Sequence, residues 1–235
     1  MRFQTPLVSG RLLRRYKRFL ADVVLDTGQE VTAHCPNPGS MLGLKDEGLR
    51  VWVEPNDDPK RKLKYAWRVS ELSNGVMVGI DTATPNRIAK EALLSKGIAE
   101  LAAYDGVRPE VAYGTRSRID FLLTEPGLPD AYVEIKNVHL LRQGDLAEFP
   151  DCVTERGAKH LRELITVKEQ GARAVMLYVV QHEGCARFRV AADLDPGYAA
   201  AFKDAVDAGV EMLAYGCAVS PEEITLTNAM PVLLD

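Results

Sequence analysis

The spacing of apolar residues changes at Thr84-Pro85, and this change constrains the fold more than any other feature of the sequence. Before it, apolar stretches of strand length are separated by Gly, Pro, Asn and Asp, which is the pattern of short strands joined by turns. The stretches are LLRRYKRFLADVVL, EVTAHC, LRVWVEP, KYAWRVSEL and GVMVGID. About five strands in so short a segment predict an all-β OB-like barrel over residues 1–84.

After this point the pattern is that of helices alternating with strands. Thr84 as a capping residue, Pro85 at the first helical position and the apolar stripe that follows predict a helix. Further helices are predicted over residues 154–170 and 198–208, between strands at VRPEVAY, SRIDFLL, YVEIKNV and ARAVMLYVV. Residues 85–235 are therefore predicted to form an α/β (α+β) domain with a mixed sheet.

Composition limits the class of protein. A chain of 235 residues with 46% apolar residues can build two cores. It contains no apolar run of bilayer length, and its first residues lack the pattern of a secretory signal. Four scattered cysteines favour reduced thiols over disulfides or a zinc cage. We expect a soluble, cytoplasmic protein with no membrane partner.

The charge is unevenly distributed. The chain has a net charge of −4, yet its first 85 residues hold 13 Lys and Arg against 10 Asp and Glu. Two tracts in this part combine cations with aromatic residues, as in a groove that binds single strands. An ordinary soluble surface is the alternative. The predicted nucleic-acid contacts are Arg11, Arg14, Arg15, Lys17, Arg18, Lys60, Arg61, Lys62, Lys64 and Trp67.

Three charged residues lie within two predicted strands that are joined by a turn. In SRIDFLL, alternation places Ile119, Phe121 and Leu123 on one face and Asp120 on the other. In YVEIKNV it places Glu134 and Lys136 together, about 6–7 Å apart. Charges inside strands are costly unless they are paired or bind a metal. An internal ion pair or a solvated strand edge is the alternative reading.

This arrangement suits the hydrolysis of phosphodiester bonds. Mg²⁺ prefers oxygen ligands and takes one or two carboxylates together with water and substrate phosphate. Asp120 and Glu134 are the predicted ligands of Mg²⁺ or Mn²⁺, with a backbone carbonyl between Glu134 and Lys136. Lys136 would orient the attacking water or offset charge on the phosphoryl oxygens.

The order Asp, turn, Glu-x-Lys resembles the core of PD-(D/E)xK nucleases. Longer segments resemble the sugar fermentation stimulation protein family (SfsA), namely HCPNPGSM, SRIDFLL, VEIKNVHL, FPD and TERGAKHLREL. The resemblance runs almost end to end. It implies an OB-like domain joined to a nuclease-like domain and a DNA-binding role. It also places Asp120, Glu134 and Lys136 at the nuclease-core positions.

Other residues are candidates for completing such a site. On the helix that contains TERGAKHLREL, Arg156 and His160 share a face, where Arg156 would hold phosphate and His160 would contact substrate or water. A solvated face of ion pairs is the alternative. Glu91 is the predicted acidic ligand from the preceding helix, although it could pair with Arg87, and Glu110 competes for the same role.

Three functions remain open from the sequence. The leading hypothesis is a divalent-metal-dependent nuclease that acts on single- or double-stranded DNA. The second is a non-catalytic DNA-binding regulator, and the third is an accessory protein that binds sugars or nucleotides. The loop HCPNPGSM is either an anion-binding concavity or a rigid loop that joins two strands. Oligomeric state is undetermined, with a homodimer as one option.

Overall fold

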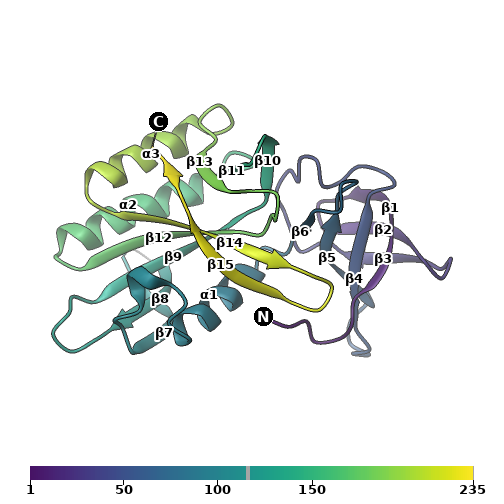
Figure 1. Cartoon of the computed structure of the whole chain (residues 1–235), viewed down its shortest axis with the longest axis horizontal. Coiled ribbons are helices and arrows are strands. Elements are labelled where there is room, and N and C mark those ends of the chain that lie inside the picture. Colours follow the sequence, from purple (N-terminus) through teal and green to yellow (C-terminus); the bar gives the residue numbers. More distant parts are fainter. Residues whose placement is uncertain (115–116, 235) are drawn as a thin grey trace.

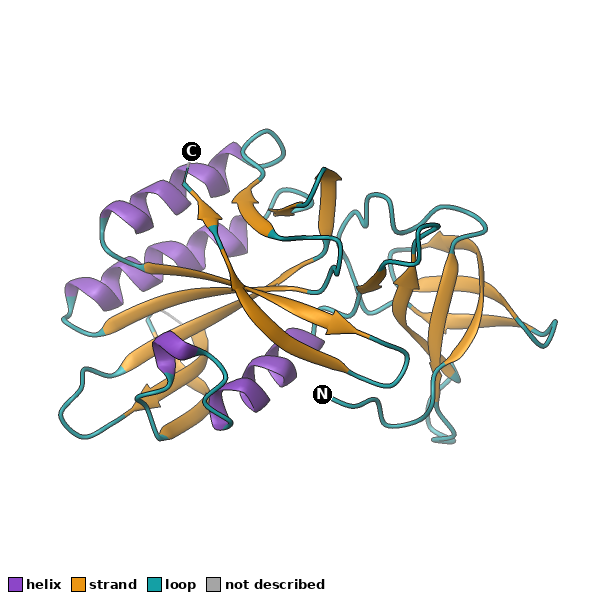
Figure 2. Cartoon of the chain, viewed as in Figure 1, coloured by secondary structure: helices purple, strands orange, loops and turns teal. Residues whose placement is uncertain are grey.

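The computed structural model describes residues 1–114 and 117–234. The chain forms a barrel of strands and a larger part in which helices cover a sheet (Figure 1). All helices drawn in Figure 2 belong to the larger part. The predicted class, an OB-like barrel followed by an α/β domain with a mixed sheet, is confirmed.

The barrel closes by pairing its third strand with its fifth. Its sheet has the order β3-β2-β1-β4-β5-β6, and a parallel pairing of β3 with β5 completes the ring. The core of the barrel contains Leu12, Val23, Val53 and Trp67, all with 0% exposure. The strands are β1 (Val8–Tyr16), β2 (Leu20–Leu25), β3 (Glu30–His34), β4 (Arg50–Pro55), β5 (Tyr65–Glu71) and β6 (Met77–Gly79).

The first helix of the larger part is α1 (Thr84–Leu94), followed by the 3-10 turn η1 (Ala99–Leu101). The prediction that Thr84 caps α1 is wrong, because Ala83 is the N-cap residue and Thr84 lies inside the helix. The side chain of Asp81 accepts a hydrogen bond from the N–H of Ala83 at 2.9 Å, which stabilises the N-terminus of α1. Ile88 and Leu93 are buried against the central sheet.

The central sheet is mixed, with the order β15-β14-β12-β9-β8-β7. Its middle strands β9, β12 and β14 run parallel, and the outer pairings are antiparallel. Strand β12 is buried along almost its whole length, as expected for a strand covered on both faces. The strands are β7 (Gly106–Tyr113), β8 (Ser117–Thr124), β9 (Ala131–Val138), β12 (Arg173–Val180), β14 (Glu211–Val219) and β15 (Ile224–Met230).

Helices α2 (Glu155–Glu169) and α3 (Pro196–Asp207) cover one face of this sheet, and α1 covers the other (Figure 1). Thr154 caps α2 by accepting the N–H of Gly157. Asp195 caps α3 by accepting the N–H of Tyr198 at 2.9 Å, and it also accepts the N–H of Thr154 at 2.8 Å. One carboxylate therefore fixes the starts of both helices.

A second, smaller sheet has the order β10-β11-β13-β16. Its strands are β10 (Leu140–Gln143), β11 (Leu146–Phe149), β13 (Arg187–Val190) and β16 (Val232–Leu233). At its centre Glu148, only 1% exposed, accepts hydrogen bonds from Arg142 and Arg189. This paired carboxylate is internal and serves the fold.

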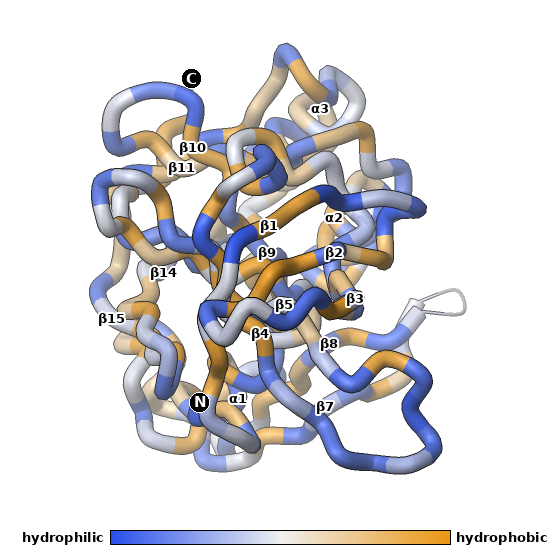
Figure 3. The backbone as a smooth tube through the Cα atoms, turned by 90° about the vertical axis from the view of Figure 1, so that its right-hand side faces the viewer, coloured by the Kyte–Doolittle hydropathy of each residue, from blue (hydrophilic) through white to orange (hydrophobic). Residues whose placement is uncertain are grey.

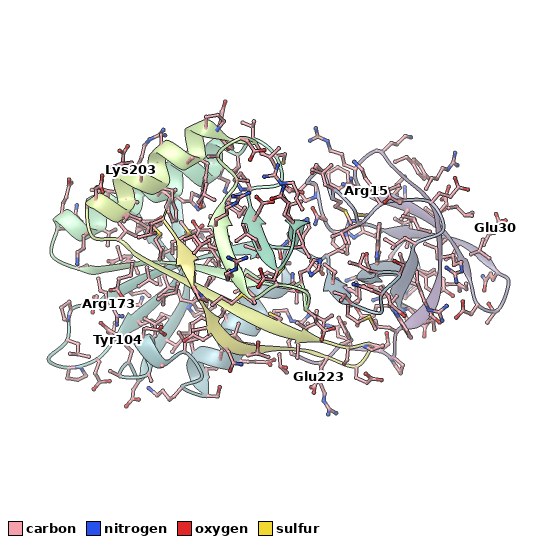
Figure 4. The ribbon with its side chains drawn as sticks, turned by 45° about the horizontal axis from the view of Figure 1, so that its top comes forward. Arg15, Glu30, Tyr104, Arg173, Lys203 and Glu223 are labelled. Carbon is pink, nitrogen blue, oxygen red and sulfur yellow. The ribbon has the colours of Figure 1, made fainter. Side chains whose placement is uncertain are left out.

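The segment HCPNPGSM joins the barrel to the larger part. Met41 donates its N–H to the Asp151 carboxylate at 3.0 Å, and Ser40 donates to the Asp151 carbonyl at 2.8 Å. Arg15 donates to the carbonyls of Asn37 and Gly39. The loop lies between β3 and β4 of the barrel, and these hydrogen bonds hold it against the larger part. Figure 4 shows Arg15 on the side of the barrel toward the larger part and Glu30 at the far end.

No helix in the described part of the chain is long and apolar enough to cross a membrane.

Candidate functional site

Two of the three charged residues of the central strands, Asp120 and Glu134, line one cavity on the face of the sheet that α2 covers, and Lys136 contacts Glu134. Asp120 comes from β8, Glu134 and Lys136 come from β9, and Lys136 Nζ lies 2.7 Å from Glu134 Oε1. The cavity has a volume of about 420 Å³. It is lined by Glu110, Ser117, Arg118, Asp120, Glu134, Arg156, Lys159 and His160.

At Asp120, the side chains of β8 stop alternating regularly between the two faces of the sheet. Ile119 packs with α2, whereas Phe121 packs on the α1 side, so the predicted shared face of these two residues is wrong. Pro109 pairs with Phe121 and Val111 with Ile119 on the neighbouring strand, which places Glu110 opposite Asp120. Glu110 has a left-handed backbone with φ of 54°. Such local irregularities redirect a side chain, and here Ile119 leaves the face of Phe121 and Leu123 and packs with α2.

The Asp120 carboxylate is held at both oxygens. Its Oδ2 accepts the backbone N–H of Ile135 at 2.7 Å, and its Oδ1 accepts the side-chain amide of Asn86 at 2.7 Å. Burial, and next the charge of Glu134, raise the pKa of Asp120, although both hydrogen bonds oppose the rise. A carboxylate in this position is stabilised in its charged form by any cation that enters the cavity.

Glu134 lies at the centre of a buried network and is only 3% exposed. Its Oε1 accepts from Lys136 and lies within hydrogen-bond reach of Nδ1 of His160. Arg156 donates from Nε to Nε2 of the same ring at 3.3 Å, which assigns the proton of a neutral imidazole to Nδ1. His160 therefore donates to Glu134, and Arg156 orients His160.

The same partners set the protonation of Glu134. Burial alone would raise its pKa, but the hydrogen bond from His160 and the charge of Lys136 outweigh it, so the pKa lies below the usual value. Glu134 is therefore ionised near neutral pH. Its second oxygen, Oε2, is buried and has no hydrogen-bond partner.

A divalent cation fits these donors. An unpartnered buried carboxylate oxygen is costly and is the kind of group that a hard cation satisfies. The described residues contain no group of three or more His, Cys, Asp or Glu placed to hold a metal ion. Asp120 and Glu134 would therefore be the side-chain ligands, and the Ile135 carbonyl, water and substrate would supply the remainder. This set suits Mg²⁺, which keeps several waters.

Glu91 does not belong to this site, and its prediction as a metal ligand is corrected. Its carboxylate lies 2.7 Å from the N-terminal amino group and is 61% exposed. It lines a separate pocket with Met1, and Arg87 is not its partner. The residue that α1 directs to the site is Asn86, in the first turn of the helix. Glu110, the competing candidate, does line the cavity.

The sequence did not single out a second group of polar residues at the edge of the cavity. Ser117 donates to Glu163 Oε1 at 2.7 Å, and Lys159 donates to Ser117 at 3.1 Å. The hydroxyl of Tyr113 is buried without a partner, and burial followed by the charge of Glu134 raises its pKa. The spacing of Arg156, His160 and Glu163 on α2 was the available signal, and it identified the correct helix face.

The predicted nucleic-acid surface requires two corrections. Trp67 is fully buried in the barrel and donates to the Val69 carbonyl at 3.1 Å, so it cannot stack on a base. Arg15 directs its donors to the carbonyls of the connecting loop. Arg14 forms an ion pair with Asp22 at 2.8 Å over the ring of Tyr16, and Arg11 donates to Gly48.

The other cations of the two tracts are exposed. Lys17 and Arg18 form the turn between β1 and β2 with φ of 49° and 63°. Between β4 and β5, Lys60, Arg61, Lys62 and Lys64 are exposed, and Lys64 donates to the Asp58 carbonyl at 2.8 Å.

Family models match both parts of the chain. A model described as "SfsA N-terminal OB domain" matches residues 13–80, and one described as "Sugar fermentation stimulation protein RE domain" matches residues 83–223.

Curated relatives match over the full length. A "Sugar fermentation stimulation protein homolog" from Jannaschia sp. (strain CCS1) is 64% identical over 99% of this chain and 97% of its own. One from Roseobacter denitrificans is 58% identical, with both chains covered completely. The solved structure of Pyrococcus furiosus SfsA "in complex with Ca2+" superposes with a TM-score of 0.87 at 27% identity, covering 99% of this chain and 98% of that one. The chain therefore belongs to the sugar fermentation stimulation protein (SfsA) family.

Proposed function

We propose that the protein binds DNA through its barrel and hydrolyses phosphodiester bonds at the Asp120–Glu134 cavity with the aid of a divalent cation. The observation that carries the proposal is the ionised, buried Glu134 with one unpartnered oxygen, beside an Asp120 whose pKa is raised. This pair has the chemistry of a cation site. The Pyrococcus furiosus relative, solved in complex with Ca²⁺, supports it, since Ca²⁺ and Mg²⁺ both take oxygen ligands.

The cationic side of the cavity suits a phosphate. Arg118, Arg156 and Lys159 line it together with the carboxylates of Glu110, Asp120 and Glu134. Guanidinium and ammonium groups bind phosphate oxygens, so a phosphodiester would be held with its phosphorus in front of Glu134. When bound, the cation would polarise the phosphoryl oxygens and lower the pKa of water.

The residues of the chain have distinct proposed roles. Lys136 lies beside Glu134 and would stabilise negative charge on the phosphoryl group as water adds and the ester bond breaks. His160 holds the Glu134 carboxylate, and Arg156 holds His160 or the substrate phosphate. Asn86 holds Asp120.

A non-catalytic DNA-binding protein is the second candidate. One observation favours it: the described residues contain no group of three or more His, Cys, Asp or Glu placed to hold a metal ion, and Lys136 and His160 already satisfy one oxygen of Glu134. In this case the cavity would bind a phosphate without cutting it.

Incubating the full chain with supercoiled plasmid and with a single-stranded oligonucleotide separates these functions. The nuclease proposal predicts cutting with Mg²⁺ or Mn²⁺ that stops when the cation is chelated. Binding that weakens steeply with salt but produces no cutting would support the second candidate. Competition by sugars but not by DNA would contradict both.

A further inference from the structure

The barrel carries a pocket that the proposed cleavage site does not use. Its volume is about 310 Å³, at the lower end of the roughly 300–1,000 Å³ typical of ligand pockets. Residues of both β3 and β5 line it. These two strands pair in parallel, with Ala33 opposite Tyr65 and His34 opposite Ala66. Figure 3 shows where β3 and β5 lie in the barrel. The lining residues are His34, Asn56, Arg61, Lys62, Leu63, Tyr65, Ala66 and Arg68.

The walls of the pocket are partly flat and apolar. Tyr65 and His34 contribute rings from adjacent strands, and Leu63 and Ala66 contribute aliphatic surface. Tyr65 is half-buried, because it also packs on the barrel core. Rings in this setting offer a stacking surface for a planar group.

The pocket has a surplus of positive charge. The charge of Arg68 is neutralised by ion pairs with Glu54 and Asp81. Arg61 and Lys62 are exposed, and none of the eight lining residues is acidic. A ligand that joins a flat apolar group to negative charge matches this combination, and a nucleotide unit has both features.

The pocket is preformed. Asn56 donates its N–H to the Lys64 carbonyl at 2.7 Å, which closes the loop between β4 and β5 at its base. Asp58 accepts the N–H groups of Lys60 and Arg61, which fixes the turn that carries the cations. Little ordering is therefore needed on binding.

A second exposed aromatic residue lies nearby. Phe19 is 51% exposed and directly follows Lys17 and Arg18 in the turn before β2. Its carbonyl accepts the N–H of Cys35, and the next residue, Leu20, pairs with His34. Phe19 therefore lies at the start of the strand that pairs with His34, directly after the cations Lys17 and Arg18.

We propose that this pocket binds one unpaired nucleobase of a single-stranded nucleic acid, stacked on Tyr65 and His34, while Arg61 and Lys62 hold the flanking phosphates. This inference rests on the proposed function and deepens it by naming the strand state of the substrate. A base in a duplex cannot enter, since its faces are stacked and its pairing edge is occupied. An acidic protein segment would match the cations but would not use the rings.

The test uses the full chain and three fluorescent probes of equal length: an oligothymidylate, the same backbone without bases, and a duplex. Stacking is worth about 5- to 150-fold in affinity per base, so the wild type is expected to bind oligothymidylate at least about 5-fold more tightly than the abasic strand. Tyr65→Leu and His34→Ala should remove this preference. Tyr65→Phe should keep it, because the ring is retained.

The cations are tested separately. Arg61→Gln and Lys62→Gln should weaken the binding of both single-stranded probes equally and reduce the dependence on salt. Lys203→Gln removes a charge from α3, where Lys203 pairs with Asp207, and should change neither quantity. His34 is exposed, so His34→Ala keeps the test valid if Tyr65→Leu fails to fold.

The outcomes separate this inference from the proposed function. Equal affinity of the wild type for oligothymidylate and the abasic strand would overturn the base pocket and leave DNA binding intact. Tighter binding of the duplex would also overturn it. Displacement of the strand by polyglutamate at equal charge would assign the pocket to acidic protein segments instead. Absence of binding to every probe would reject the proposed function together with the pocket.

Discussion

The side-chain amide of Asn86 donates a 2.7 Å hydrogen bond to Oδ1 of Asp120, which links the first turn of α1 to the carboxylate on β8. The other oxygen of Asp120 accepts from the backbone of the strand that carries Glu134. The two hydrogen bonds fix the direction of the carboxylate. Residues that orient a metal ligand in this way affect metal affinity almost as strongly as the ligands themselves.

Replacing Asn86 with alanine should therefore weaken divalent-metal binding. We expect a loss of about 10- to 100-fold in affinity for Mn²⁺, measured by calorimetric titration, and a similar loss of cleavage. Asn74→Ala is the matched control, because Asn74 accepts only the N–H of Val76 in an exposed turn. Unchanged Mn²⁺ affinity in Asn86→Ala would show that Asp120 does not depend on this amide.

The connecting loop should not tolerate a side chain at position 39. A Cβ on Gly39 would lie 2.6 Å from Oδ2 of Asp151, so the loop or Asp151 must move. We expect Gly39→Ala to lower the unfolding free energy by about 1–3 kcal/mol in denaturant titrations. Gly97→Ala, whose Cβ would meet atoms no closer than 3.5 Å, should change it by less than about 0.5 kcal/mol. Equal stability of the two variants would contradict the tight contact.

Asp151 should make stability at the junction depend on pH. Burial would raise its pKa, but His139, whose Nε2 lies 3.4 Å from Asp151 Oδ2, and the hydrogen bond from the Met41 N–H outweigh it, and the pKa falls well below its ordinary value of 3.8. A group with a lowered folded pKa stabilises the protein above its unfolded pKa, and this contribution is lost as pH falls toward the folded pKa. The stability difference between the wild type and Asp151→Asn should therefore be full at about pH 5 and shrink below about pH 4. A difference that grows on acidification, in denaturant titrations at each pH, would contradict this.

Trp67 should matter for folding and not for nucleic-acid binding. Its ring is completely buried, so Trp67→Ala should cost about 3–5 kcal/mol of unfolding free energy. Trp67→Phe keeps most of the apolar contact and is the variant for binding measurements. The affinity of Trp67→Phe for oligothymidylate should equal that of the wild type. A loss of affinity as large as that of Tyr65→Leu would show that Trp67 contributes to nucleic-acid binding.

The sequence predicted most strands of the barrel because turn residues separate them, but it left β1 and β2 as one stretch. The turn between them contains no Gly or Pro, and Lys17 and Arg18 adopt the left-handed conformation that usually favours glycine. Strands β14 and β15 and the small sheet were not predicted. In the small sheet, the pairings of β11 with β13 and of β13 with β16 join segments far apart in the chain, and local periodicity does not report such pairing.

The sequence also predicted some residues of the site and missed others. Alternation along β9 placed Glu134 and Lys136 on one face, and the helix face of Arg156 and His160 was also identified. The prediction of Glu91 was wrong because charge suggested it, whereas the residue of α1 that contacts Asp120 is the uncharged Asn86 in the first turn. Trp67 was misplaced because composition does not reveal which side of a barrel strand is buried.

The measurement that tests the central claim most directly is the rate at which single-stranded DNA is cut in Mn²⁺ by the wild type, Glu134→Gln and Lys136→Met. Affinity for the strand is measured in parallel by anisotropy. The account predicts metal-dependent cutting by the wild type and a loss of at least about 100-fold in both variants, while strand affinity stays within about 3-fold, since removing a group used in the transition state lowers rate more than binding. Equal cutting by the wild type and Glu134→Gln, or no cutting by a wild type that binds both Mn²⁺ and the strand, would contradict it.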